Sequence, residues 1–374
     1  MRIVVLGGAG DMGAEAVRDL VGFSKAHQIV IADRNVREAE RLAASLGDER
    51  VGVEEVDATS HESLVRLMRG SSKMSGGTVV AGALGPFYRF ERPIIEAAIE
   101  AGANYVSICD DHDAVEAALE LNDLARQKGR RIIPGMGWTP GLSNMLARRG
   151  YELLNNVEKI NIYWGAGVSD SKGLAVILHT IHIFTGKVNS FSGGKPVLVK
   201  AGSAKEAVSF PDPLGEIKTF HLGHPEPVTL PRYLKGVNEI TLKGGLAENY
   251  LNYLAKILSG LGLTRTSFTK QMLGYMMKGL LPVLPKNKKK GVSGIRVDIR
   301  GKLSGNPITV SYAVVDKMRR LTGIPLSIGA IMLAENKVPA FGVFGPEADN
   351  AVDSKLFFKE LSRRGIMIGE REIQ

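Results

Sequence analysis

The segment RIVVLGGAGDMGAEAV, residues 2–17, decides the fold. A short apolar run rich in β-branched residues leads directly into glycines and then into apolar residues at helical spacing, which indicates a strand followed by a helix. The turn between them, Gly8–Gly13 (GAGDMG), fits the pattern G-x-G-x-x-G. In that position the pattern predicts a dinucleotide-binding βαβ unit, with a glycine-rich turn that binds nothing as the alternative.

The glycines and the start of the helix have separate expected tasks. We expect Gly8 to allow the tight turn, Gly10 to let the backbone approach a pyrophosphate, and Gly13 to let helix and strand pack closely. The amides at the helix start, including those of Asp11 and Met12, are expected to bind the phosphates.

An acidic residue, Asp33, ends the next predicted strand, twenty residues after Gly13. Its carboxylate is expected to bind the adenine ribose hydroxyls and to repel a 2′-phosphate, which favours NAD. Arg34 could contact that phosphate instead, so NADP stays possible. Asp57 follows the third strand and is expected beside the adenine, or alternatively as a cap for the helix that starts at Ser60.

Strand-like and helix-like segments alternate through residue 140. The predicted strands are residues 2–7, 28–33, 51–57, 77–83, 104–109 and 130–135, and the predicted helices are 12–23, 36–46, 61–68, 93–101 and 113–127. This alternation predicts an α/β fold, a Rossmann-type doubly wound parallel sheet with helices on both faces.

Ligands bind beyond the carboxyl ends of the strands in such sheets. The loops after the fourth and fifth strands, residues 82–89 and 109–113, should therefore face the nicotinamide. We expect Ala83 and Leu84 to contact the cofactor, and Tyr88 and Arg89 to contact a substrate carboxylate.

The second half of the chain has longer and more polar strand-like segments, at 159–167, 188–194, 196–201, 216–222, 237–243, 294–302 and 307–315. Residues 171–184, 247–261 and 267–281 are predicted helices, and 325–336 and 354–364 are terminal helices that return to the first domain. We therefore predict a dinucleotide-binding domain of residues 1–140 completed by 322–374. Residues 141–321 form an inserted α+β domain on a mixed sheet, for substrate binding and dimerisation.

The bulk composition is that of an enzyme in a reducing compartment. The 374 residues are 44% apolar and 23% charged, and no apolar run is long enough to span a bilayer. Cys109 is the only cysteine, and the chain starts on a strand with no export signal, so we expect a cytoplasmic protein. The net charge of +9 is scattered apart from Lys286–Lys290, so neither nucleic acid nor membrane is an expected partner.

Several motifs, in this order, resemble the saccharopine dehydrogenase family. They follow the glycine-rich start and are ADR at 32–34, ALGPFYRFERPIIEAAIEAGANYVSICDD at 83–111, GMGWTPGLSNMLA at 135–147, SFSGGKP at 190–196, FPDPLGEIKTFHLGHPEPVTLPR at 210–232 and FGVFGPE at 341–347. The resemblance implies an NAD(P)-linked oxidation or reduction at a C–N bond of an amino acid or polyamine. It also implies a Rossmann domain interrupted by an α+β domain, and a homodimer.

Residues 137–141 (GWTPG) depart from the G-x-D-P-G that saccharopine-forming members commonly carry, and the PGLSN ending is more like the lysine 6-dehydrogenase branch. The main hypothesis is a dehydrogenase similar to saccharopine or lysine 6-dehydrogenases. The alternatives are an imine reductase of polyamine synthesis, similar to carboxynorspermidine dehydrogenase, and a non-catalytic dinucleotide-binding protein.

Asp110, Asp111 and His112 are the candidate catalytic residues, together with Tyr88. Hydride can leave a carbon that bears nitrogen only when the amine is neutral, so a base must first remove a proton. His112 has a suitable pKa, and Asp110 or Asp111 could bind the ammonium group. Which of the three is the acid/base stays open, and Asp111 or Asp113 could simply cap the following helix.

In the second domain, His179 and His182 lie one helical turn apart. Two histidines without a third ligand are weak evidence for zinc, so no metal is expected and His179 is a candidate substrate contact. Arg232 and Lys172 are further candidates for binding a substrate carboxylate.

Overall fold

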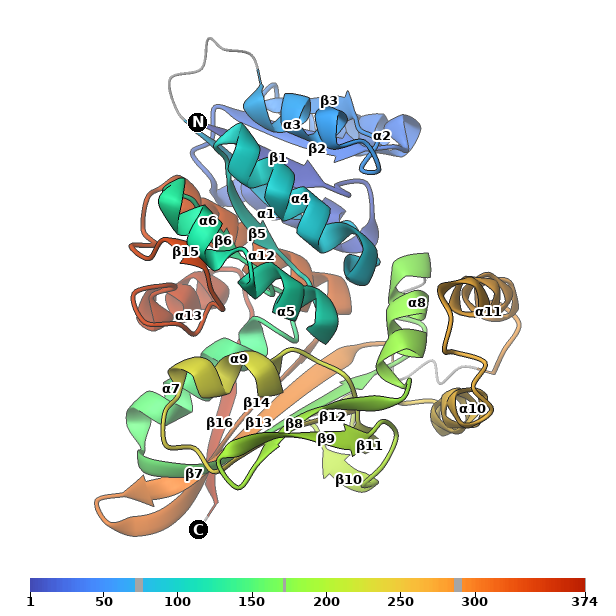
Figure 1. Cartoon of the computed structure of the whole chain (residues 1–374), viewed down its shortest axis with the longest axis vertical. Helices are drawn as coiled ribbons and strands as arrows, with labels where there is room; N and C mark the ends of the chain where they lie inside the picture. The colour runs from blue at the N-terminus through green and yellow to red at the C-terminus, as the bar shows by residue number, and fades with distance from the viewer. Residues whose placement is uncertain (71–76, 171–172, 286–290, 374) are drawn as a thin grey trace. The chain divides into compact units, whose positions relative to one another are not determined.

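The computed structural model describes residues 1–70, 77–170, 173–285 and 291–373 (Figure 1). The chain divides into two compact units, Met1–Leu142 with Arg319–Arg364 and Ser143–Met318 with Gly365–Gln374. Two features named from the sequence, Lys172 and the basic run Lys286–Lys290, lie outside the described residues. Within the described ranges, no helix has the length and apolar character needed to cross a membrane.

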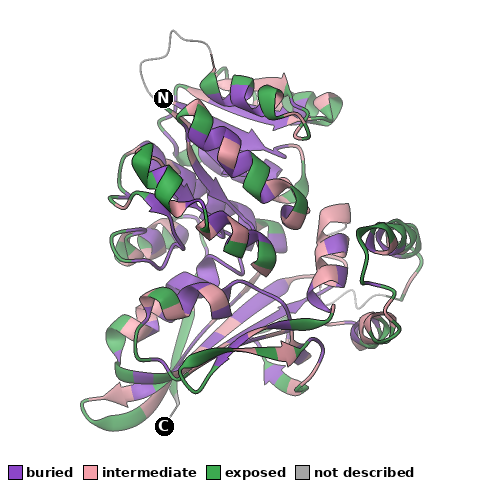
Figure 2. Ribbon diagram, in the orientation of Figure 1, coloured by how far each residue is buried: buried purple, intermediate pink, exposed green. Residues whose placement is uncertain are grey.

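A parallel sheet forms the centre of the first unit. Among the described residues its strand order is β15-β6-β5-β4-β1-β2-β3. The strands are β1 (Arg2–Leu6), β2 (Gln28–Asp33), β3 (Val51–Glu55), β4 (Thr78–Gly82), β5 (Asn104–Ser107), β6 (Arg131–Ile133) and β15 (Gly342–Val343). The central strand β1 is buried along its whole length and its neighbours β2 and β4 except at their ends (Figure 2), which explains their continuous apolar sequences. The predicted doubly wound Rossmann-type fold is confirmed.

Helices cover this sheet. They are α1 (Asp11–Phe23), α2 (Val36–Leu46), α3 (His61–Arg69), α4 (Phe87–Ala101), α5 (His112–Leu119), α6 (Asn122–Gln127), α12 (Met318–Ala334) and α13 (Ser354–Arg363). Two of them, α4 and α12, start six and seven residues earlier than predicted, because each continues through an internal proline, Pro93 and Pro325. The single helix predicted over 113–127 is two helices, α5 and α6, which meet at Glu120 and Leu121.

A mixed sheet forms the centre of the second unit, as predicted. The main strand order is β10-β11-β12-β7-β13-β14-β16, and β8 pairs with β12 and β9. The β12–β7 pair is parallel and the β13–β7 pair is antiparallel. The strands are β7 (Asn155–Ala166), β8 (Lys187–Ser192), β9 (Lys195–Lys200), β10 (Glu206–Ser209), β11 (Glu216–His221), β12 (Glu239–Leu246), β13 (Ser293–Leu303), β14 (Asn306–Asp316) and β16 (Gly369–Ile373).

The helices of the second unit are α7 (Leu142–Leu153), α8 (Leu174–Ile183), α9 (Glu226–Tyr233), α10 (Asn249–Gly260) and α11 (Ser267–Leu280). Gly274 of α11 packs against α8, because a Cβ added to this glycine would lie 2.6 Å from the Leu178 side chain. Sequence periodicity missed α7 and α9.

The C-terminal segment is shared between the two units. Helix α13 belongs to the first unit, where Arg364 Nε donates to both carboxylate oxygens of Asp19 on α1, at 2.8 and 2.9 Å. The strand after it, β16, pairs antiparallel with β14 in the second sheet. Residues 322–374 were expected to complete the first domain. The part from Gly365 onward instead belongs to the second unit, because β16 adds to the edge of the second sheet.

Candidate active site

The glycine loop between β1 and α1 has the backbone that the sequence motif requires, with one difference. Gly7, not Gly8, has the left-handed φ of +73°, and a Cβ on Gly7 would lie 2.7 Å from the Ala83 carbonyl oxygen. A Cβ on Gly13 would clash with the Gly7 carbonyl oxygen, so Gly13 permits the close packing of helix and turn. A Cβ on Gly8 would lie 2.9 Å from the Val5 carbonyl oxygen, so the tight turn requires Gly7 as well as the expected Gly8.

Gly10 is exposed and precedes α1 as its N-cap residue. A Cβ built on Gly10 meets only the Gly7 carbonyl oxygen, in a tight contact at 3.3 Å that a small backbone shift would relieve. The amides of the first helical turn, Asp11 and Met12 among them, point out of the helix end and can bind an anion. The loop therefore fits a dinucleotide pyrophosphate.

Asp33 lies at the carboxyl end of β2, directly beside this loop. Its Oδ2 accepts a hydrogen bond from Ala9 N at 3.1 Å, and its Oδ1 accepts one from Asn35 N at 2.9 Å. These bonds fix a half-buried carboxylate where a ribose would bind. Arg34 is exposed.

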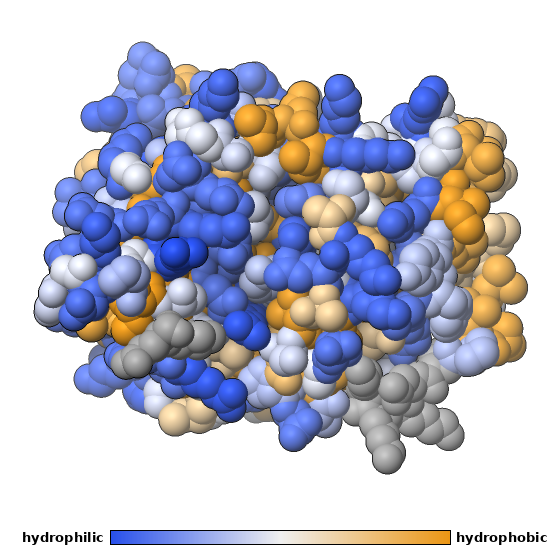
Figure 3. Space-filling view, turned by 90° about the horizontal axis from the view of Figure 1, so that it is seen from below, coloured by the Kyte–Doolittle hydropathy of each residue, from blue (hydrophilic) through white to orange (hydrophobic). Residues whose placement is uncertain are grey.

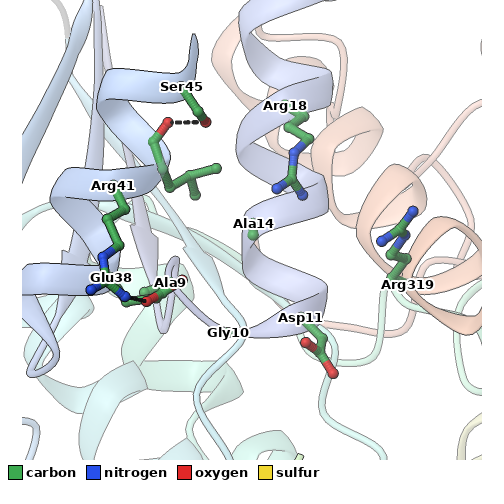
Figure 4. Close-up of a pocket in the computed structure, with 10 residues that line it drawn as sticks. Ala9, Gly10, Asp11, Ala14, Arg18, Glu38, Arg41, Ser45 and Arg319 are labelled. Carbon is green, nitrogen blue, oxygen red and sulfur yellow. Dashed lines mark hydrogen bonds and ion pairs between the residues drawn. The ribbon is translucent and has the colours of Figure 1, made fainter. Parts of the chain in front are cut away.

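A pocket of about 270 Å³ opens between α1 and α2, beside Gly10 (Figure 4). Arg18 and Arg319 lie on its α1 side, 3.7 and 3.6 Å from Glu15 Oε2. On the α2 side, Arg41 is 3.1 Å from Glu38. The pocket wall therefore carries three arginines and two acidic residues, Asp11 and Glu38, next to the phosphate-binding loop.

Asp57 is exposed, and its carboxylate belongs to the turn before α3. Thr59 donates to Asp57 Oδ1 through both its amide, at 2.9 Å, and its hydroxyl, at 2.7 Å, and these bonds lower the pKa of Asp57. The N-cap of α3 is Ser60, which accepts from Ser63 N. Asp57 thus orders the turn without capping the helix itself.

The loop after β4 touches the glycine loop. Ala83 N donates to Leu6 O at 2.8 Å, and Ala83 and Leu84 are half-buried. Tyr88 and Arg89 were expected in this loop but belong to the first turn of α4. Arg89 is exposed and lies over the Phe90 ring, 5.0 Å from its centroid.

Asp111 connects the loop after β5 to α4. It is fully buried, and its Oδ2 accepts a hydrogen bond from Tyr88 N at 2.9 Å. Asp111 occupies the N-cap position of α5 without a side-chain hydrogen bond to that helix, so helix capping does not explain it. Burial, followed by the charges of Asp111 and Asp113, raises the pKa of Tyr88, so the phenol stays neutral. Asp110 and His112 flank Asp111 and are half-buried.

Sequence reasoning missed Glu91, a fully buried carboxyl group on α4. It accepts hydrogen bonds from the Tyr105 hydroxyl at 2.8 Å and from Ser107 Oγ at 2.5 Å, both on β5. Burial raises its pKa to about 7. The signal was present, because Glu91 falls on the same helical face as the apolar residues Phe87, Ile94 and Ile95.

In the second unit, His179 packs edge-on against His224, with ring centroids 5.2 Å apart. His224 Nδ1 is 3.9 Å from the buried carboxylate of Glu226, which accepts from Ser143 Oγ at 2.7 Å. Neither His224 nor Glu226 stood out in the sequence, although both lie in the quoted motif at 210–232. These residues form a buried polar cluster within this unit.

Two further candidates of the second unit are His182 on α8 and Arg232 on α9. His182 is not equivalent to His179, since its Nδ1 is 2.6 Å from Lys270 Nζ. Arg232 is exposed near the end of α9.

A parallel sheet with a glycine loop at the start of α1 and a carboxylate at the end of β2 defines a dinucleotide-binding oxidoreductase of the Rossmann type. Residues 3–133 match the family described as the saccharopine dehydrogenase NADP binding domain. The chain is similar to carboxyaminopropylagmatine dehydrogenase of Synechocystis sp., with 21% identity over 402 residues covering 98% of this chain and 96% of the relative. Its fold is similar to that of saccharopine dehydrogenase (L-Glu forming) from Saccharomyces cerevisiae, with a TM-score of 0.70, 14% identity and 100% of both chains covered. Residues 3–133 therefore match the NADP-binding domain of the saccharopine dehydrogenase family, and the chain is an NAD(P)-dependent oxidoreductase.

Proposed function

We propose that the enzyme oxidises or reduces a C–N bond of an amino acid or its conjugate. The observation that carries this proposal is the buried carboxylate of Asp111, fixed by Tyr88 N at the carboxyl end of β5. In a parallel sheet this edge faces the nicotinamide end of a dinucleotide. A buried carboxylate there attracts a substrate ammonium group strongly, because water does not screen the pair.

Chemistry in the oxidative direction needs one proton and one hydride to leave the substrate. His112, or Asp110, takes a proton from the ammonium group, and Asp111 holds the nitrogen in place. The bound oxidised nicotinamide supplies the hydride acceptor. The nitrogen lone pair then forms the C=N bond of an iminium ion, which water or another amine attacks, and the reductive direction reverses these steps.

A scan of amino acids, their conjugates and polyamines with NAD and NADP, read at the absorbance of reduced nicotinamide, tests this proposal. We expect turnover with a substrate that carries an amine on the reacting carbon. Activity only with alcohols or aldehydes, under conditions where NADH binds, would contradict it.

A second candidate is the reduction of an imine in polyamine synthesis. It is supported by the similarity along nearly the whole chain to a relative named carboxyaminopropylagmatine dehydrogenase. The same scan distinguishes the two, because a polyamine substrate would carry its reacting nitrogen on a chain of further amines. His179 and Arg232 remain predicted substrate contacts in either case.

For the cofactor we propose NAD over NADP, because Asp33 sets a negative charge where the 2′-phosphate would lie. The arginines of the neighbouring pocket, Arg18, Arg41 and Arg319, favour the opposite preference. Both NAD and NADP are therefore included in the substrate scan. We further propose that the enzyme acts in the cytoplasm, since its single cysteine fits a reducing compartment.

We also propose a homodimer joined through the second unit. Across the part of the chain that the structure describes, twelve of eighteen exposed large apolar side chains lie between Tyr250 and Val283. This α10–α11 surface, at the right edge of Figure 3, is rich in Tyr, Phe and Met. No Asp or Glu occurs from residue 249 to 297. Depletion of acidic residues and enrichment in aromatic residues and Met are typical of the core of a protein–protein interface, which supports a second copy as the partner.

A further inference from the structure

The buried carboxyl group of Glu91 has no part in the proposed chemistry, yet it is joined to the loop that carries the chemistry. Its two oxygens accept hydrogen bonds from Tyr105 and Ser107 on β5. Both donors are buried, and the side chain of Glu91 is 0% exposed. A carboxyl group held in this way costs folding free energy when it is charged, so its presence calls for an explanation beyond packing.

Two chains of contacts lead from Glu91 to Asp111. In the first, the Ser107 hydroxyl that donates to Glu91 also accepts from Cys109 N, at 3.3 Å, and Cys109 Sγ donates to the Asp111 carbonyl oxygen, at 3.8 Å. In the second, Glu91 lies one helical turn after Tyr88, whose amide holds Asp111 Oδ2. The carboxyl group of Glu91 thus supports the loop at both of its attachments.

The charge of Glu91 is coupled to the same loop. Burial raises the pKa of Glu91 to about 7, the hydrogen bonds from Ser107 and Tyr105 lower it, and the negative charges of Asp111 and Asp110 raise it further. Cys109 and Tyr105 also face Glu91, and burial keeps both neutral by raising their pKa. Because electrostatic coupling is mutual, a proton lost from Glu91 raises the pKa of Asp110 and Asp111.

We propose that Glu91 is a positioning residue, which holds the loop of Asp110–His112 in its working geometry and tunes the charge of that loop by gaining or losing a proton. The effect of Glu91 on catalysis rests on the proposed function, whereas the titration of its buried carboxyl group does not.

The titration can be tested without any substrate, through the melting temperature as a function of pH. The pKa of Glu91 in the folded protein, about 7, exceeds the value of about 4.3 in an unfolded chain. The contribution of Glu91 to folding stability is therefore fully present below its pKa in the unfolded chain, and it is lost as the pH rises through its pKa in the folded protein. We expect the Tm of the parent, relative to the Tm of Glu91→Gln, to fall steadily as the pH rises from about 4.3 to about 8.

Glu96→Gln is the matched control, since Glu96 lies on the same helix with its side chain 41% exposed and paired with Arg92. Its Tm should follow the parent at every pH. A Tm difference between parent and Glu91→Gln that stays constant across this range would overturn the proposed titration.

The link to the loop is tested by the pH profile of kcat/KM on the substrate found in the scan. We expect Glu91→Gln to remove one apparent pKa near 7 from that profile, while NADH affinity stays within about twofold of the parent. Ser107→Ala interrupts the first chain of contacts but keeps the carboxyl group. It should lower kcat, and the apparent pKa should stay in the profile but move upward, because the hydrogen bond from Ser107 lowers the pKa of Glu91.

An unchanged pH profile in Glu91→Gln would overturn the tuning role, and unchanged kcat in Ser107→Ala would overturn the support role. Failure to find any C–N substrate would count against the proposed function alone, because the melting experiment does not depend on it. If Glu91→Gln does not fold, Tyr105→Phe removes one hydrogen bond from the same carboxyl group and should raise its pKa, which moves the loss of Tm to higher pH.

Discussion

Tyr88 N and Asp111 Oδ2 are joined by a 2.9 Å hydrogen bond between residues 23 positions apart in the chain. The bond ties the first turn of α4 to the loop after β5, so the two segments expected to face the nicotinamide form one substructure. Because the donor is a backbone amide, side-chain substitutions leave it in place. The charge of Asp111 can therefore be removed while its position is preserved.

Replacing Asp111 by Asn, or His112 by Gln, should lower kcat by about a hundredfold or more, because a well-placed acid/base group is lost. The affinity for NADH and the Tm should stay near the parent values, since Asn still accepts from Tyr88 N. Steady-state kinetics, NADH titration and thermal melting measure the three quantities. Asp113→Asn, at an exposed position one residue further on, is the control. Variants that lose stability and keep their turnover would mean that this loop is only structural.

Gly10→Val should weaken NADH binding far more than it lowers Tm. Its Cβ meets only Gly7 O, in a tight contact at 3.3 Å, and the side chain projects toward the pyrophosphate path. Gly22→Ala, at an open position of the same helix, is the control for binding and melting. Gly13→Ala should destabilise the fold itself, because of its clash with Gly7. Equal NADH affinity of Gly10→Val and the parent would show that the dinucleotide does not cross this loop.

Asp33→Ser should narrow the preference for NAD over NADP, because the charge that repels a 2′-phosphate is removed. The ratio of kcat/KM for the two cofactors measures it. Arg34→Ala is the companion variant and should weaken NADP use more than NAD use. If the parent already uses NADP better, the arginines of this region dominate over Asp33 and the proposed preference is wrong.

Arg364→Met should lower the free energy of unfolding by about 3–5 kcal/mol, because it leaves the buried carboxylate of Asp19 without its cation. The two side chains are only 2% and 6% exposed. Arg363→Met is the control, since its side chain is 58% exposed and a surface pair contributes at most about 1 kcal/mol. Denaturant unfolding gives both values. Adding Asp19→Leu to Arg364→Met should recover much of the loss. No recovery would mean that the other contacts of Arg364 dominate, with the Phe23 ring 4.0 Å away and with Glu360 at 2.6 Å.

Phe268→Glu should convert the proposed dimer to a monomer in light scattering, because it places a charge on the α10–α11 surface. Phe268 is 76% exposed. Leu198→Glu, at a 63% exposed position on β9 of the same unit, should remain dimeric. A parent protein that is monomeric at micromolar concentration contradicts the proposal. Binding of such a monomer to vesicles of anionic lipid would assign the surface to a membrane instead.

Local patterns were sufficient to predict the parallel sheet, the mixed sheet and the dinucleotide loop. Strand–helix alternation and the glycine spacing are short-range features, and they identified Gly10, Gly13 and Asp33 correctly as neighbours in one loop region. The predicted start of α4 at Pro93 was wrong, because the helix tolerates this proline in its interior and begins at Phe87.

Contacts between distant residues could not be predicted. Ser143 and Glu226 meet across 83 positions, and the strand β16 finds its partner β14 only after the chain has returned to the second unit. Glu91 illustrates the same limit at shorter range. A glutamate on a buried helical face signals an unusual site, but its partners depend on the register of β5 against α4, which periodicity does not specify.

The Asp19–Arg364 pair has a consequence for synthesis of the protein. The two residues are 345 positions apart, which corresponds to roughly 20–70 s of translation at about 5–20 residues per second. During that time α1 has left the ribosome, while the helix that carries its arginine partner does not yet exist. The nascent dinucleotide-binding unit therefore waits, incompletely packed, while the inserted unit is made. A chain that terminates early never acquires the cation, so quality-control proteases can distinguish it from the finished enzyme.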